Sequence, residues 1–369
     1  MIPFRTILVI FLVLLFGSHY LAYVSTVHFF AITNNVYRKV LAAAIAFLSV
    51  SFILSSVLIS RQENYFTRAT YLLSGYWLGL LVNLLLAIAA VWLVIAVYRL
   101  MGFQPKTAML GLICFGLACM YSVYGIWNAD HPQIKNITVT IHNLPQQWKD
   151  KKIVQLSDVH MGHVHRAEFL RRIVAKVIAV HPEMVVITGD FFDGMDGDLQ
   201  QLVQPLNDLG PEKGIFFITG NHETFLGIDK VFAAFQNTRV QILQDQVVDV
   251  DGLKVIGIGY PRRGENKDVV EVLHSLEKDF AGRPNLFLYH APVYIDEFKN
   301  SGVNLQLSGH THQGQIYPFR YITELVYKGY DYGLHRMGDY TLYTTNGAGT
   351  WGPAMRTGNT PEVVVVTLQ

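Results

Sequence analysis

Two side chains that can bind a metal directly follow a short apolar run in the middle of the sequence. The run from Ile153 to Leu156 stops at Ser157, and Asp158 and His160 come next. A carboxylate and an imidazole two residues apart at the end of a buried strand can project into one crevice. Taken alone, this pair also fits an ordinary strand followed by a polar turn. Its interpretation as a metal site therefore depends on whether the arrangement recurs.

The arrangement recurs four more times along the chain. Each time a short apolar run ends in aspartate, asparagine or histidine, and these residues are Asp190, Asn221 with His222, His290, and His310 with His312. Parallel strands place their C-terminal ends at one rim of a sheet, so we expect these side chains to form one metal site. Both cysteines, Cys114 and Cys119, lie in an apolar run far from the motifs, which leaves oxygen and nitrogen as ligands.

The elements that must position these residues make up only part of the chain, because the whole is unusually apolar. Of its 369 residues, 51% are hydrophobic and 15% charged, and the mean hydropathy is +0.28. Four apolar runs each have the length of about 20 residues that a bilayer-spanning helix needs; they are Ile7 to Phe30, Val40 to Ser60, Tyr71 to Tyr98 and Thr107 to Trp127. We therefore expect a four-helix transmembrane region over residues 1–127 and a globular domain over residues 128–369.

The expected spans indicate a structural membrane anchor rather than a transporter. Their only ionisable side chains beyond the ends are His19 and His28, whereas transporters usually carry functional charges inside their spans. An even number of spans puts the N-terminus and the globular domain on one side of the membrane. The basic residues on the two sides, four against four, decide neither orientation, whereas Arg5 ahead of the first span favours the cytoplasmic side. The sequence thus predicts a multi-pass protein of the cell membrane, or of the inner membrane in a bacterium.

Charge limits the partners of the globular domain. Residues 1–127 hold seven basic residues and one acidic residue, which leaves 22 of the 29 basic and 27 of the 28 acidic residues to the rest of the chain. This balance of about −5 argues against a nucleic acid partner, since binding to a phosphate backbone needs a basic surface.

The remaining periodicity predicts an α/β or α+β fold in which two sheets form a sandwich flanked by helices. Residues at helical spacing run from Phe169 to Ile178 and from Val269 to Phe280. Strand patterns cover Ile137 to Ile141, three consecutive short segments from Val240 to Ile258, and a closing strand from Pro361 to Leu368.

The ordered motifs resemble the calcineurin-like metallophosphoesterase family, over roughly Ile134 to the C-terminus. They are D-x-H at Asp158, G-D-x-x-D from Gly189 to Asp193, G-N-H-E from Gly220 to Glu223, a lone His290, and G-H-x-H from Gly309 to His312. Y-K-G-Y after the last motif, and the segment containing Arg356 and Glu362, are similar to the membrane-anchored bacterial type. Each motif is weak alone, whereas the complete set in this order is specific.

The resemblance implies a binuclear metal centre. One metal would be held by Asp158, His160 and His312, the second by Asn221, His290 and His310, and Asp190 would bridge them. A metal-bridging hydroxide would then attack phosphorus while both cations neutralise phosphoryl oxygens. Histidine, aspartate and asparagine ligands without thiolate favour Mn, Fe, Zn or Co.

The resemblance also implies the acid–base residues. His222 would act as the general acid that protonates the leaving oxygen, and Asp193 would orient and charge its imidazole. Glu223 is expected to support its loop. His163 and His165 lie outside the motifs, and we interpret them as surface or substrate-rim residues. Gln313 stands where the subgroup often has glycine, which puts the substrate specificity of that subgroup in doubt.

The leading hypothesis is a membrane-anchored, metal-dependent phosphoric ester hydrolase, acting on a phosphodiester rather than a monoester. Its substrate would be membrane-proximal, such as a lipid-linked phosphate ester, because aromatic segments from Ile316 to Tyr321 and from Tyr327 to Tyr332 follow the last motif. The alternatives are a catalytically silent membrane receptor or scaffold, and a transporter with a regulatory phosphoesterase-like domain. A silent domain should have lost a ligand or the acid, and all are present.

Overall fold

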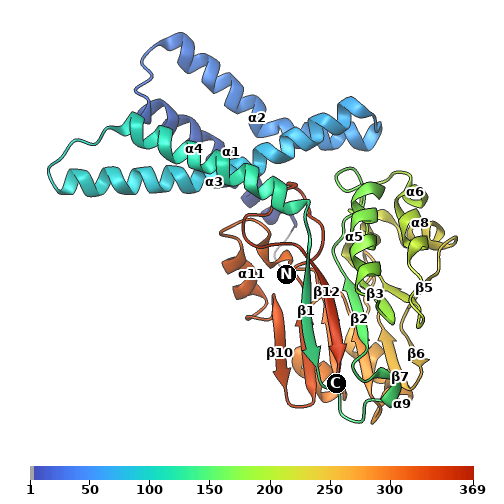
Figure 1. Ribbon diagram of the computed structural model, residues 1–369. Coiled ribbons are helices and arrows are strands. Elements are labelled where there is room, and N and C mark those ends of the chain that lie inside the picture. Colours follow the sequence, from blue (N-terminus) through green and yellow to red (C-terminus); the bar gives the residue numbers. More distant parts are fainter. Residues whose placement is uncertain (1–3) are drawn as a thin grey trace. The chain divides into compact units, whose positions relative to one another are not determined.

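The computed structural model describes residues 4–369 and divides the chain into two compact units (Figure 1). The helical unit comprises the chain up to Trp127 together with a short later segment, Gly352–Thr357. The second unit comprises Asn128–Trp351 and Gly358–Gln369, and it is called the catalytic unit because it contains the residues expected to be catalytic. Residues 352–357 therefore belong to the helices by their contacts although they follow the metal motifs in sequence.

Four long helices form the first unit, as expected from the apolar runs. They are α1 (Phe4–Phe29), α2 (Asn35–Arg61), α3 (Tyr65–Leu100) and α4 (Thr107–Ala129). All four are long and apolar enough to cross a membrane, with only short connections between them. The prediction of a multi-pass membrane protein is confirmed.

Polar side chains inside this unit bond to each other in pairs. The indole Nε1 of Trp77 donates to His19 Nε2 at 3.0 Å, and that of Trp92 donates to Ser25 Oγ at 3.0 Å. Asn83 Nδ2 of α3 donates to a serine of α4 at 2.8 Å. Such interhelical bonds satisfy groups that lipid would leave unpaired.

Glycines of α3 and α4 make room for the segment Gly352–Thr357. A Cβ on Gly79 would lie 2.8 Å from Met355 Sδ, and one on Gly125 would lie 2.5 Å from Thr357 Cγ2. The backbone N–H of Arg356 donates to the carbonyl of Gly125 at 2.9 Å, and the Tyr121 hydroxyl donates to the carbonyl of Thr357. Larger residues at these helix positions would displace the segment.

Two six-stranded sheets build the catalytic unit, as predicted. The first has the order β1-β12-β2-β3-β4-β5, with β2 to β5 parallel to one another and β12 antiparallel to β2. Its strands are β1 (Gln133–Val139), β2 (Lys152–Leu156), β3 (Met184–Thr188), β4 (Ile215–Ile218), β5 (Val240–Ile242) and β12 (Glu362–Leu368).

The second sheet has the order β10-β11-β9-β8-β7-β6, with β7, β8, β9 and β11 parallel and the two outer strands antiparallel. Its strands are β6 (Gln246–Val250), β7 (Leu253–Gly257), β8 (Asn285–Leu288), β9 (Leu305–Ser308), β10 (Gly333–Met337) and β11 (Tyr340–Thr344). The run of short strands expected from Val240 to Ile258 is thus divided, because β5 ends the first sheet and β6 begins the second.

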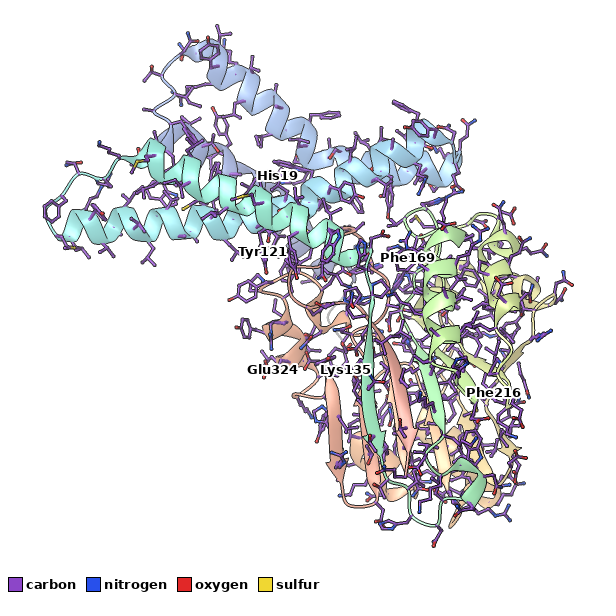
Figure 2. All side chains as sticks on the ribbon, in the orientation of Figure 1. His19, Tyr121, Lys135, Phe169, Phe216 and Glu324 are labelled. Carbon is purple, nitrogen blue, oxygen red and sulfur yellow. The ribbon has the colours of Figure 1, made fainter. Side chains whose placement is uncertain are left out.

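Apolar side chains fill three layers around these sheets. The cluster between the sheets joins Ile153, Phe216, Leu286 and other buried residues from both. Outside the first sheet, α5 (Ala167–Ala179) contributes Phe169 and its apolar face (Figure 2). Outside the second, α9 (Val269–Phe280) and α10 (Ile295–Asn300) do the same. The remaining helices are α6 (Leu199–Val203), α7 (Asn221–Leu226), α8 (Ile228–Phe235) and α11 (Arg320–Val326).

Candidate metal centre

The five motifs follow the C-terminal ends of three parallel strands in the first sheet and two parallel strands in the second. Asp158 and His160 follow β2, Asp190 follows β3, Asn221 and His222 follow β4, His290 follows β8, and His310 and His312 follow β9. Five of these residues have a positive φ between 48° and 74°, the left-handed region that non-glycine residues rarely adopt; they are Asp158, His160, Asp190, His310 and His312. Strained backbone of this kind is typical of functional sites.

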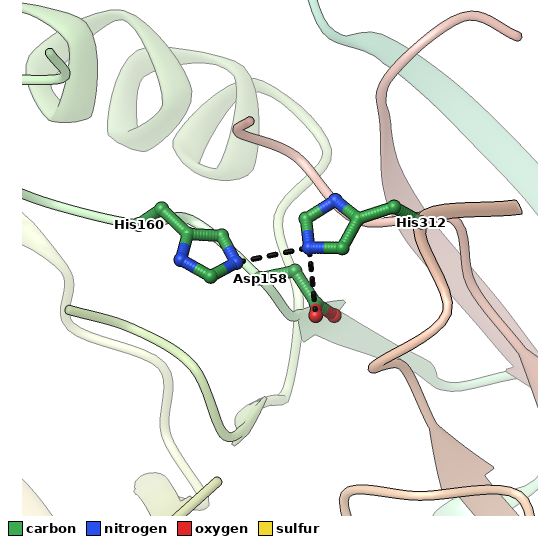
Figure 3. Close-up of side chains that lie close together, drawn as sticks. All are labelled: Asp158, His160 and His312. Carbon is green, nitrogen blue, oxygen red and sulfur yellow. Dashed lines mark hydrogen bonds and ion pairs between the residues drawn. The ribbon is translucent and has the colours of Figure 1, made fainter. Parts of the chain in front are cut away.

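The first group of donors comprises Asp158, His160 and His312 (Figure 3). The Nε2 atoms of His160 and His312 face each other at 2.9 Å, and His312 Nε2 lies 3.4 Å from Asp158 Oδ1. Asp158 is completely buried, and the Nδ1 atom of His160 has no hydrogen-bond partner among the described residues. Lone pairs that converge at these distances in a buried place fit a shared cation.

The second group comprises Asp190, His290 and His310. His290 Nε2 lies 3.1 Å from Asp190 Oδ2 and 3.2 Å from His310 Nδ1. His290 Nδ1 donates to the carbonyl of Thr188 at 2.8 Å, which aims Nε2 at the carboxylate. The side-chain oxygen of Asn221 is buried without a hydrogen-bond partner among the described residues, which fits a carbonyl ligand.

Asp190 is placed to serve both groups. Its Oδ2 lies 3.1 Å from His290 Nε2 and 4.0 Å from His160 Nε2, and Asp190 is buried. The donor types and their convergence fit two divalent cations that share this carboxylate. Neither group contains a thiolate, as expected from the cysteine positions.

Two motif glycines are required by the carboxylates. A Cβ on Gly309 would overlap the Asp158 carboxylate, and one on Gly220 would overlap that of Asp190. The neighbouring backbone then binds the same groups, since His310 N donates to Asp158 Oδ1 at 3.0 Å and His222 N donates to Asp190 Oδ1 at 2.9 Å. The glycines in these motifs therefore fix the carboxylate positions.

Burial and neighbouring charges shift the pKa values of Asp190, His290 and His310. Burial opposes ionisation of Asp190, but the facing imidazoles, His290 above all, hold the pKa of Asp190 well below its ordinary value. Burial opposes protonation of His290, yet Asp190 outweighs it and raises the pKa of His290 to about 9. Burial and the charge on His290 lower the pKa of His310 to about 4. The mutual attraction of Asp190 and His290 thus outweighs their burial and favours the charged forms of both.

His222 lies beside the two donor groups and forms a third group with His160 and Asp190, in which the possible ligand atoms all lie within 4.8 Å of one another. Its Nε2 is 4.0 Å from Asp190 Oδ2, and its ring centroid is 4.7 Å from that of His160. Its side chain is 10% exposed. Phe225 and Trp351, both largely exposed, have their ring centroids 5.6 and 6.1 Å from the His222 ring.

Asp193 contacts His222 differently from the expectation. The His222 Nδ1 atom donates to the backbone carbonyl of Asp193 at 2.7 Å. The Asp193 carboxylate instead accepts backbone N–H groups of His163 at 3.1 Å and Met195 at 2.9 Å. Burial raises the pKa of Asp193 to about 7. The carboxylate therefore shapes the loop, and its main chain orients the imidazole.

Glu223 supports its loop as expected. Its buried carboxylate accepts backbone N–H groups of Asp190 at 2.9 Å, Phe192 at 3.0 Å and Gly220 at 2.7 Å. It ties the turn after β3 to the turn after β4. Its position three residues after Gly220, at the start of α7, is the signal that indicates this role.

The interpretation of His163 and His165 as surface or rim residues is wrong. Both are buried, at 3% and 4% exposure. His165 stacks on Phe169 at 4.0 Å between ring centroids and bonds the hydroxyl of Thr350 at 2.9 Å. The packing of the turn after β2 under the start of α5 buries them, which local sequence does not reveal.

Tyr260 and Tyr327 flank the second donor group, and the sequence analysis did not assign either to the site. The ring of Tyr260 lies 5.9 Å from that of His290 and 6.1 Å from that of His310, and the ring of Tyr327 lies 6.0 Å from that of His310. Tyr260 follows β7, which ends at the same rim, so its position after one more apolar run could have indicated it.

Gln313 has φ 46° and ψ 37°, the left-handed conformation for which glycine would be the easier residue. Its side chain helps to line a cavity of about 380 Å³ with Lys135, Arg320 and Glu362. Glu362 accepts hydroxyls of Tyr343 at 2.8 Å, Thr345 at 2.8 Å and Tyr332 at 3.1 Å. The departure from glycine thus changes a cavity wall and leaves the ligands in place.

The segment that contains the five motifs also matches a known protein family. Residues 151–314 match the family model described as calcineurin-like phosphoesterase. An uncharacterized metallophosphoesterase of Campylobacter jejuni is 32% identical over 322 residues, which cover 85% of each chain. A transmembrane protein with metallophosphoesterase domain from Bos taurus is 28% identical over 91% of this chain and 81% of its own. The crystal structure of a dimetal phosphatase from Danio rerio aligns over 54% of this chain and 88% of its own, at 13% identity and a TM-score of 0.38.

Proposed function

This chain belongs to the calcineurin-like phosphoesterase family, and we propose that it is a membrane-anchored, two-metal phosphodiesterase. The observation that carries the proposal is the pair of buried donor groups around Asp190. Asp158, His160 and His312 would hold one cation, Asn221, His290 and His310 the other, and Asp190 both. When bound, two cations supply Lewis acidity toward phosphoryl oxygens and a lowered pKa for attacking water.

His222 carries the proton in this proposal. Because the Asp193 carbonyl accepts from Nδ1 at 2.7 Å, that nitrogen keeps its hydrogen and Nε2 is the atom that gives up or takes a proton. Nε2 lies beside the donor groups, 4.0 Å from Asp190 Oδ2. A leaving ester oxygen bound over Asp190 would be within its reach, so His222 is the general acid.

The surroundings of the site favour a diester. Four aromatic residues, Tyr260, Tyr327, Phe225 and Trp351, lie around the donor groups and His222. Aromatic rings offer contact to a second esterified substituent. A monoester has no second substituent to make such contacts.

A silent receptor or scaffold, and a transporter with a regulatory domain, are less well supported. Neither would need the six ligands of the two donor groups to converge, nor a strained backbone at five of them. The buried histidine of the helical unit, His19, is bonded to Trp77 and offers no ion path.

The full-length protein in detergent micelles provides the test. We expect hydrolysis of bis-p-nitrophenyl phosphate to exceed that of p-nitrophenyl phosphate, to disappear with a chelator and to return with Mn²⁺, Co²⁺ or Zn²⁺. Tyr121→Phe, far from the donors in sequence and in the other unit, serves as the matched control and should retain the rate. Full activity in excess chelator would exclude the two-metal enzyme, and a preference for the monoester would exclude the diester assignment.

A further inference from the structure

One stretch of the catalytic unit exposes a continuous series of large apolar side chains. Tyr317, Phe319 and Tyr321 are 37%, 42% and 55% exposed. Ile322, Leu325 and Val326 follow at 58%, 81% and 63%. Most of these residues belong to α11, a helix without a single buried residue. A folded unit gains nothing from displaying such a surface to water.

The rest of the catalytic unit shows how unusual this stretch is. Its other exposed large apolar residues are isolated from one another in sequence; they are Ile178, Phe225, Tyr294 and Trp351. Single exposed apolar residues are normal on any protein surface, whereas six within residues 317–326 make a patch. We call residues 317–326 the α11 surface.

The composition of the α11 surface matches the interfacial layer of a bilayer. It combines tyrosines and a phenylalanine with branched aliphatic residues, the set that partitions at the depth of lipid headgroups. Arg320 lies within it, 5.7 Å from the Tyr321 ring, and the exposed Lys328 follows it. Its one acidic residue is Glu324, labelled in Figure 2. Basic residues beside apolar ones favour an anionic leaflet.

A bilayer is within reach of this surface because the chain itself crosses one. Helix α4 ends at Ala129 and β1 begins at Gln133, so the connector extends over at most about 14 Å. No second protein needs to be recruited for the α11 surface to find an apolar partner.

The α11 surface also leads directly to the metal site. It begins two residues after Gln315, in the loop that carries His310 and His312, and Tyr327 follows its last residue. The ring of Tyr327 packs 6.0 Å from that of His310. A Cβ on Gly314 would overlap the backbone of Phe319 and Arg320, so the ligand loop and the start of α11 are closely packed.

We propose that the α11 surface docks into the headgroup layer of an anionic bilayer and presents the metal site to a phosphate ester resident in that layer. The docking itself does not depend on the proposed hydrolysis, whereas the substrate class rests on it. Tyr327 would then lie between the leaflet and the second donor group.

Photo-crosslinking of the full-length protein in nanodiscs tests the docking without any activity measurement. A benzophenone side chain is placed at Leu325, and at Ile178 as a matched exposed apolar control on α5. In discs of mixed phosphatidylcholine and phosphatidylglycerol, we expect at least about fivefold more lipid adducts at position 325 than at 178. Equal adducts at both positions would overturn the proposal. Adducts from position 325 to a second copy of the chain would overturn it too, by assigning the surface to a protein interface.

A second measurement separates docking from catalysis. We expect the double variant Leu325→Asp with Val326→Asp to hydrolyse bis-p-nitrophenyl phosphate at the parent rate, but to lose about tenfold of its rate on the p-nitrophenyl ester of phosphatidic acid in the same discs. Ile178→Asp is the control and should keep both rates. An unchanged rate on the lipid ester would overturn the substrate class. Absence of hydrolysis in the parent protein would contradict the proposed function and leave the crosslinking result valid.

Discussion

Both units contain buried histidines, and the contacts of His19 and His160 differ. In the helical unit, His19 Nδ1 bonds the carbonyl of Leu15 at 2.7 Å and its Nε2 accepts from Trp77 at 3.0 Å. In the catalytic unit, His160 Nε2 faces another imidazole nitrogen at 2.9 Å, and its Nδ1 has no hydrogen-bond partner among the described residues. One histidine is satisfied by donor–acceptor pairing, and the other belongs to a candidate metal-binding group. Burial therefore does not distinguish a structural from a ligand histidine, whereas the identity of the facing atom does.

Glycines of the two units also make room for different kinds of atoms. Gly79 and Gly125 make room for apolar and backbone atoms of the segment Gly352–Thr357. Gly220 and Gly309 make room for carboxylates that the metal site uses. In both units the missing Cβ permits close approach, but only in the catalytic unit is the approaching group a carboxylate.

The largest expected effect comes from removing the shared ligand. We expect Asp190→Asn to lower the metal content measured by elemental analysis from two ions per chain toward none, and to abolish hydrolysis, because one carboxylate serves both donor groups. His19→Ala should leave metal content unchanged. If Asp190→Asn retained both ions, the shared role of this carboxylate would be disproved.

His222→Ala separates proton transfer from metal binding. We expect metal content to stay intact and turnover of an alkyl phosphodiester to fall about 10²- to 10⁴-fold. Activated aryl esters should lose much less, since their leaving groups need no proton. Equal losses on both kinds of ester, or loss of metal, would assign His222 a structural role.

Asp193 is expected to tolerate one substitution better than another. Asp193→Asn keeps an acceptor for the backbone N–H groups and the same main-chain carbonyl to His222, so we expect a loss in turnover of less than about tenfold. Asp193→Ala removes both acceptors and should cost more. Comparison of the two rates on one alkyl diester checks this. Equal losses would show that the carboxylate charge, rather than the loop, matters.

The smallest effect is expected in the helical unit. His19→Ala leaves the Trp77 indole without its acceptor, which should reduce the free energy of unfolding by about 1 kcal/mol. A small drop in the melting temperature of the purified protein, with unchanged metal content and turnover, is the expected outcome. A change in metal content would contradict the separation of the two kinds of buried histidine.

Much of this protein is already determined by local sequence. Apolar runs of bilayer length define the four helices, and apolar runs that end in aspartate, asparagine or histidine define the rim strands, because hydrophobic length and strand-end chemistry are local properties. The order of the five motifs suffices to identify the family. Glu223 was also assigned correctly to its loop, since a helix-start position is local.

Only the tertiary structure decided the rest. His163 and His165 are buried by the packing of α5 over the turn after β2. Asp193 contacts His222 through its main chain because backbone N–H groups capture the carboxylate. The segment Gly352–Thr357 joins the helices, and the α11 surface remains uncovered. In each case the outcome depends on which residues, distant in sequence, pack against the residue or segment. The spacing of residues along the chain does not determine this packing.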